Sequence, residues 1–152
     1  MYERKVIGLA EAEAAVKAVI EEASKTDIPV TAAIVDHDGI LVYLARMDRA
    51  TWTSVAMAIK KAYSSAKVRN HTRAVGQFIQ KMGWGDMGSA FGTDVTVIPG
   101  GLSITEPVEG PINPGRHVCY GGIGISGRPA DDDEALAKVG LKALQDVVWP
   151  QQ

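Results

Sequence analysis

The sequence predicts an α+β protein built around one mostly antiparallel sheet. Apolar residues recur at helical spacing in segments near both ends of the chain and in its middle, and short β-rich runs lie between these segments. The runs follow one another through short connections, which suit antiparallel strands, whereas parallel strands need a longer crossover. We therefore expect five strands flanked by helices, in a single domain that spans residues 1–152.

The composition fits a folded protein with no nucleic-acid or membrane partner. The chain has 152 residues, of which 46% are hydrophobic and 22% charged, and this supplies enough apolar surface for a core. A net charge of -2 offers no basic surface for nucleic acid, and no apolar run reaches the length of a membrane span. A single cysteine cannot form an internal disulfide, and the amino-terminal segment lacks the pattern of a secretory signal. We expect a cytoplasmic protein.

The first part of the chain predicts a helix followed by a hairpin. Residues Leu9–Ala23 place apolar side chains on one helical stripe and charged side chains opposite, and the helix should end before the following proline. Two β-rich runs, Val30–Val35 and Ile40–Ala45, enclose an Asp-Gly pair that is typical of a tight hairpin turn. Residues 36–38 read Asp-His-Asp, which are metal-ligand types. Acceptors crowded at a turn indicate turn chemistry instead, and we predict no metal site.

Two further helices and an irregular segment follow. Helical spacing covers Trp52–Asn70, after a threonine that can cap the helix, and a shorter helix is expected over Ala74–Lys81. Basic residues along the first of these helices either complement its dipole or capture an acidic ligand. The glycine-rich stretch Met82–Asp94 has little periodicity. Its aromatic and methionine side chains cover a ligand, plug the core or form an oligomer interface.

The second half of the chain predicts three strands and a final helix. The strand signals lie at Val95–Ile98, Leu102–Ile104 and Val118–Ser126. The last helix starts at an acidic run, Asp131–Glu134, where negative charge complements the helix dipole, and its apolar stripe extends to Val147.

Glycine is concentrated between Val97 and Gly127, and the pattern has two explanations. A Pro-Gly-Gly turn leads into a proline-rich loop and then into a Gly-Gly-Ile-Gly-Ile-Ser-Gly strand. Glycine inside a strand marks a bulge or a close approach of another group to the backbone. The approaching group is either a ligand, in a pocket lined by backbone, or a neighbouring helix. The loop before this strand also carries reactive side chains, at residues 116–120.

Four motifs occur in a fixed order along the chain: AAIVDHDGILVYLARMDRA, AIKKAYSSA, VIPGGLSI and GGIGISGRPADDDEALAKVGLKAL. In this order they resemble the GlcG/HbpS family, which includes the carboxyl-terminal domain of PduO-type proteins. The resemblance extends from Leu9 to Val147. It implies a profilin-like sandwich that assembles into dimers or larger rings. Some members of the family bind haem or cobalamin-related tetrapyrroles.

The chain departs from the pattern of this family at one loop. Relatives usually join the strand after the Pro-Gly-Gly turn to the next strand through a short turn, whereas Thr105–Tyr120 forms a longer loop with three prolines. A loop that is stiffened by proline and rich in functional groups is typical of a binding site. The departure favours an enzyme over plain haem storage.

We favour a small-molecule-binding protein that acts as a cofactor-independent lyase or isomerase on a small carboxylate. Arg116 would clamp the carboxylate, and His117 or Tyr120 would move protons. The adjacent Cys119 is expected to be buried and inert. Backbone amides near three glycines would stabilise developing negative charge, namely Gly100, Gly101 and Gly122.

Two alternatives stay open. A protein that binds haem or another tetrapyrrole needs an axial ligand such as His37, His71 or His117. The apolar walls of its pocket would come from Trp52, Trp84, Met87 or Phe91. Of these residues, we include His71 and Trp84 among the predicted ligand-binding residues. The other alternative is a non-catalytic assembly protein that uses the same loop as an interface. A homo-oligomer is expected, because apolar strands and an aromatic loop are hard to cover in one small domain.

Overall fold

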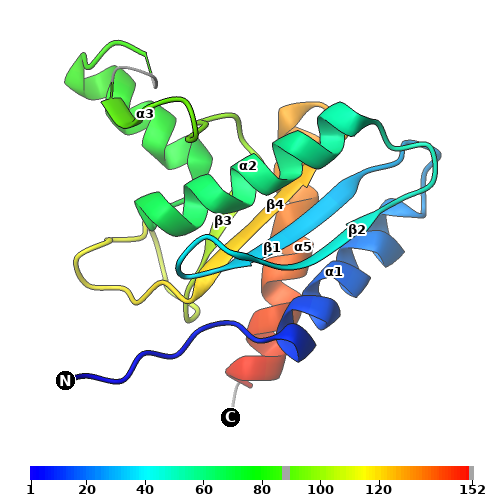
Figure 1. Ribbon diagram of the computed structural model, residues 1–152, viewed down its shortest axis with the longest axis horizontal. Coiled ribbons are helices and arrows are strands. Elements are labelled where there is room, and N and C mark those ends of the chain that lie inside the picture. The colour runs from blue at the N-terminus through cyan, green and yellow to red at the C-terminus, as the bar shows by residue number, and fades with distance from the viewer. Residues whose placement is uncertain (87–89, 151–152) are drawn as a thin grey trace.

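A computed structural model describes residues 1–86 and 90–150, so that Met87, one of the residues expected to wall a haem pocket, lies outside the described residues. Apart from one predicted strand, the elements follow the predicted order of helices and strands (Figure 1). They are α1 (Leu9–Ala23), β1 (Thr31–Asp36), β2 (Leu41–Arg46), α2 (Trp52–Val68), α3 (Thr72–Met82), β3 (Gly101–Ile104), β4 (Gly121–Ser126) and α5 (Ala130–Val148). Within the described part of the chain, no helix combines the length and the apolar character that crossing a membrane requires.

The strands form one antiparallel sheet in the order β2-β1-β4-β3, which confirms the α+β prediction. Helix α2 covers one face of the sheet, and α1 and α5 cover the other (Figure 1). Alternate residues of β1 divide between the two sides: Ile34 packs in the core with α1 and α5, whereas Ala33 and Val35 pack against α2. Because both faces of β1 are buried, its sequence reads as a continuous apolar run and not as an alternation.

The prediction of five strands is wrong by one, because Val95–Ile98 is not a strand. The backbone of this segment bonds to helix side chains and not to the sheet. The N–H of Thr96 donates to Ser64 Oγ at 2.8 Å, and the carbonyl of Ile98 accepts from Thr72 Oγ1 at 2.9 Å. This segment is therefore held on α2 and α3 by its backbone, and its β-favouring residues are not paired with a strand.

The turn between β1 and β2 is held by Asp36, as turn chemistry predicts. Asp36 Oδ1 accepts the N–H groups of Asp38 and Ile40, each at 2.9 Å, and Gly39 has a φ of +86°. The Asp38 carboxylate pairs instead with Arg4, at 2.9 Å. These contacts hold the turn, which places the intervening His37.

Helix α2 is tied to the amino end of α5 by an ion pair inside the protein. Lys61 Nζ lies 2.9 Å from Asp133 Oδ2, and each side chain is only 2% exposed. The same ammonium donates to the carbonyl of Ile125 in β4 at 2.8 Å. Burial raises the pKa of the Asp133 carboxyl, and Lys61 and the N–H of Arg128 act in the opposite direction. Lys61 therefore neither complements the helix dipole nor captures a ligand.

Candidate functional site

Three glycines of the sheet, Gly101, Gly122 and Gly124, lie directly under α2 and leave no space for a ligand. A Cβ atom would stand 2.4 Å from the carbonyl oxygen of Lys61 at Gly101, and 2.2 Å from that of Ala62 at Gly122. At Gly100, where φ is +118°, it would meet the Ile125 carbonyl and Lys61 Nζ, both at 2.9 Å. Of the two explanations of the glycine-rich segment, the structure supports the approach of a helix. The predicted backbone-lined pocket at Gly100, Gly101 and Gly122 is thus contradicted.

The loop that carries Arg116 and His117 folds into a turn on Asn113. The carbonyl of Asn113 accepts the N–H groups of Arg116 at 3.0 Å and of His117 at 2.9 Å. In return, the N–H of Asn113 donates to His117 Nδ1 at 2.9 Å. Arg69, which ends α2, donates to the carbonyl of His117 at 3.4 Å. The imidazole of His117 thus helps to hold the turn, and Arg116 is exposed beside it.

Tyr120 is directed away from that turn. Its hydroxyl donates to Glu106 Oε1 at 2.9 Å, and its ring centroid lies 5.0 Å from that of Trp149. Burial, followed by the hydrogen bond and charge of Glu106, raises the pKa of Tyr120. The polar atoms of the predicted proton-transfer residues Tyr120 and His117 therefore bond to different partners.

The hydrogen bonds of the three histidines of the chain require one tautomer for His71 and His117 and the other for His37. His71 Nδ1 accepts the N–H of Ser103 at 3.2 Å, and burial lowers the pKa of this imidazole, which is therefore neutral with its hydrogen on Nε2. His117 Nδ1 also accepts a backbone N–H, so its neutral ring carries the hydrogen on Nε2 too. His37 Nδ1 lies 2.8 Å from the carbonyl oxygen of Cys119. Because a carbonyl can only accept, His37 Nδ1 is the donor and the neutral ring has its lone pair on Nε2.

His37 lines a cavity of about 520 Å³, which we call the His37 cavity. Three cationic side chains and one carboxylate line it beside His37. The complete lining is Tyr2, Glu3, Arg4, Lys5, His37, Arg69, Val118, Cys119 and Tyr120. The pairing of Asp36 with Gly121 in the β1–β4 ladder brings the hairpin turn beside the end of the loop. From the sequence, His37 could be assigned only to a turn. The pairing of Asp36 with Gly121 shows that this turn also borders a cavity.

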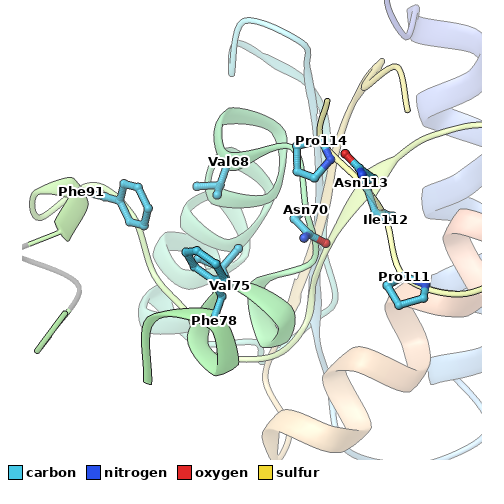
Figure 2. A pocket seen from close by; sticks show the side chains of 9 residues that line it. All are labelled: Val68, Asn70, Val75, Phe78, Phe91, Pro111, Ile112, Asn113 and Pro114. Carbon is cyan, nitrogen blue, oxygen red and sulfur yellow. The ribbon is translucent and has the colours of Figure 1, made fainter. Parts of the chain in front are cut away.

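A second cavity, of about 600 Å³, lies beside α3, and we call it the apolar cavity (Figure 2). Its walls come from α2, α3, the segment before β3 and the long loop. They are Val68, Asn70, Val75, Phe78, Phe91, Pro111, Ile112, Asn113 and Pro114, none of which is charged. Val68 and Asn70 line this cavity, whereas Arg69 between them lines the His37 cavity. The end of α2 and the long loop therefore contribute to both.

The predicted aromatic walls take different positions. Trp84 is 47% exposed and packs edge-on against Phe78, with ring centroids 5.3 Å apart, so it supports the apolar cavity from behind its lining. Trp52 is 78% exposed at the start of α2. His71 lies at the start of α3 and lines neither cavity.

Cys119 is buried, as expected from its position in the chain. Its sulfur accepts from Ser103 Oγ at 3.2 Å and lies 3.3 Å from the carbonyl oxygen of Gly121. Among the described residues, no group of three or more histidine, cysteine, aspartate and glutamate side chains could hold a metal ion.

The fold matches that of several solved α+β proteins. The Klebsiella pneumoniae protein ORFY is 24% identical and has a TM-score of 0.78, with 95% of this chain and 94% of that chain covered. A crystal structure of PduOC in complex with haem is 23% identical and has a TM-score of 0.76, with 91% and 94% covered. HbpS of Streptomyces reticuli, solved as a double mutant, is 23% identical and has a TM-score of 0.77. The match covers 95% of this chain and 90% of that chain. At these identities the likeness establishes the fold.

The family model described as "Haem degrading protein HbpS-like" matches residues 7–142. The chain therefore belongs to the HbpS-like family, as its motifs predicted. A curated relative is a 15.0 kDa Citrobacter freundii protein encoded in the dhaT–dhaS intergenic region. It is 28% identical over an alignment of 147 residues, and the alignment covers 93% of this chain and 94% of the relative.

Proposed function

We propose that the chain binds haem or a related metal tetrapyrrole in the His37 cavity, with His37 as the metal ligand. The observation that carries the proposal is the 2.8 Å hydrogen bond from His37 Nδ1 to the Cys119 carbonyl. Histidines that bind metals typically donate their second ring N–H to a carbonyl or carboxylate, which fixes the tautomer and orients the ring. His71 and His117 use Nδ1 as an acceptor and lack this arrangement.

The charges of the His37 cavity suit the carboxylates at the edge of a haem. Arg4, Lys5 and Arg69 line it. Arg4 already pairs with Asp38, so Lys5 and Arg69 are the cations that would form charge-assisted hydrogen bonds with the carboxylates. Val118 and Tyr120 supply apolar surface in the same cavity. When bound, a haem iron would supply redox chemistry and an open position for a further ligand. The haem complex of the relative PduOC supports the same ligand class for this chain.

A haemin titration followed at the Soret band tests this assignment. We expect saturable binding by the wild-type protein, and a loss of at least about tenfold in affinity for His37→Ala, which is about 1.4 kcal/mol. His71→Asn is the matched control, because His71 lines neither cavity and asparagine keeps an acceptor for the Ser103 N–H. Affinities of His37→Ala and wild type within about twofold would show that His37 is not the ligand.

A second candidate function is proton transfer on a small carboxylate in the same cavity. The Nε2 lone pair of His37 is a base, and Lys5 and Arg69 of the same cavity would hold the carboxylate. In this lyase or isomerase hypothesis, His37 moves the proton in place of His117. The test is exchange of the C3 hydrogens of 2-oxobutyrate in D2O, followed by NMR. Exchange above the buffer rate that His37→Ala abolishes supports an enzyme, and exchange at the buffer rate with wild type contradicts it for this substrate.

The expected homo-oligomer also remains a proposal. Strand β2 is an edge of the sheet, and the apolar residues near it are exposed: Ile40 by 65%, Leu41 by 46% and Trp52 by 78%. An edge strand with exposed apolar neighbours is a surface that a second copy can cover. Sedimentation velocity at micromolar concentration should show a dimer or larger species, and a monomer would contradict this proposal.

A further inference from the structure

The apolar cavity is separate in its chemistry from the His37 cavity. Its walls carry the rings of Phe78 and Phe91 with aliphatic and proline side chains, and no charged residue lines it. A volume of about 600 Å³ is within the range of pockets that bury small organic ligands. A charged ligand would find no ionic partner among the lining residues to offset the hydration that it loses on binding. The walls therefore favour a neutral ligand.

Two asparagine side chains are the polar groups of this cavity, and both are oriented by the backbone. Asn70 Oδ1 accepts the N–H of His71 at 2.8 Å, and Asn113 Oδ1 accepts the N–H of Gly115 at 2.9 Å. Since each amide oxygen is engaged, each side chain has its NH₂ group left to donate. In Figure 2, Asn70 lies between Val75 and Phe78 of α3 and the loop residues around Asn113. The cavity thus presents donors and matches a ligand with acceptors.

We infer that the apolar cavity is a second binding site, which takes a neutral aromatic compound bearing a carbonyl oxygen. The rings of Phe78 and Phe91 pack on the aromatic part, and the NH₂ groups of Asn70 and Asn113 donate to the carbonyl. Aromatic rings prefer offset or edge-to-face packing on one another, which the two phenylalanines on opposite segments allow. The site does not depend on the haem proposal, because it shares no lining residue with the His37 cavity.

Three naphthalenes that differ in one substituent test the ligand class. 2-Acetylnaphthalene is neutral and has the carbonyl, 2-ethylnaphthalene lacks the acceptor, and 2-naphthoate is charged. Binding to the wild-type protein is measured by equilibrium dialysis. We expect the ketone to bind at least about tenfold more tightly than either of the others. Equal binding of the ethyl compound would overturn the role of the asparagines, and preferred binding of the carboxylate would overturn the neutral-ligand class.

Asn70→Asp and Asn113→Asp test the residues, because aspartate keeps an oxygen for the backbone N–H and removes the NH₂ donors. Each variant should weaken 2-acetylnaphthalene at least about fivefold and leave 2-ethylnaphthalene within about twofold. Gln77→Glu is the matched control: it makes the same chemical change at an exposed position on α3 outside the lining, and it should leave both ligands within about twofold. Unchanged ketone binding in both aspartate variants overturns the proposal, and so does equal weakening by the control.

Discussion

The glycines of the sheet and the long loop between β3 and β4 come from one glycine- and proline-rich segment, yet they have opposite surroundings. Under α2 there is no free space: a Cβ atom at Gly124 would stand 2.1 Å from the Ala58 carbonyl oxygen. The loop Thr105–Tyr120 is held by hydrogen bonds within itself and by hydrogen bonds to distant segments, such as those from His37 and Arg69, and it contributes lining residues to both cavities. Glycine therefore serves close packing in one region, whereas proline and polar side chains shape binding surfaces in the other.

This contrast implies that changes under α2 alter the stability of the fold, whereas changes in the loop mainly alter binding. Both regions meet at the carboxyl end of α2, where Arg69 takes a left-handed backbone conformation with a φ of +58°. The predictions below test the contrast with free energies of unfolding measured by denaturant titration.

Lys61→Met should have the largest effect on stability. It leaves the Asp133 carboxylate buried without its partner, and breaking a buried ion pair costs about 3–5 kcal/mol. Lys142→Met is the control, because its pair with Asp146 is exposed and such pairs contribute about 0–1 kcal/mol. The double variant Lys61→Met/Asp133→Leu should recover much of the loss. Equal effects of the two lysine variants would contradict the special role of the buried pair.

Gly124→Ala should be the next most destabilising change, by about 1–3 kcal/mol, because the methyl group meets the backbone of α2 and not a flexible side chain. Gly115→Ala in the loop is the comparison. There a Cβ would meet only Asn113 Oδ1, at 3.3 Å, so the expected cost is below about 1 kcal/mol. A loop variant as unstable as the sheet variant would remove the contrast between the two regions.

The neutral, half-buried imidazole of His71 should make stability depend on pH. Burial lowers its pKa in the folded protein, so below about pH 6.5 the unfolded chain binds a proton that the folded chain does not. Its contribution is present above that pH and is lost as the pH falls, by at most about 1.4 kcal/mol per pH unit. Unfolding free energies from pH 7.5 to 5 should fall more steeply for wild type than for His71→Asn. Parallel curves would contradict this assignment.

Tyr120→Phe should have the smallest effect, about 1 kcal/mol or less, because it removes one hydrogen bond to the exposed Glu106. Glu106→Gln keeps an acceptor in place and should cost less than Tyr120→Phe. A loss of more than about 2 kcal/mol in the free energy of unfolding for Tyr120→Phe would mean that the end of the loop stabilises the fold as the sheet under α2 does.

Local patterns in the sequence were sufficient for most of the fold. The apolar stripe of Leu9–Ala23, the Asp-Gly turn of the hairpin and the threonine at the start of α2 depend on interactions between residues close in the chain. The structure has α1 at those bounds, and Thr51 Oγ1 accepts the N–H of Ser54 at 3.3 Å. The ordered motifs likewise indicated the family, because they extend along nearly the whole chain.

Tertiary structure decided which groups meet, because those contacts join residues far apart in the sequence. Val95–Ile98 has the composition of a strand, but Ser64 and Thr72 take up its backbone groups. The same holds for the site: no local pattern distinguishes His37 from His71 and His117. The partner of His37 is a carbonyl 82 residues away, and that contact fixes its tautomer. The sequence by itself determined the elements and the family, whereas the packing of α2 on the glycines and the path of the loop decided where the cavities lie.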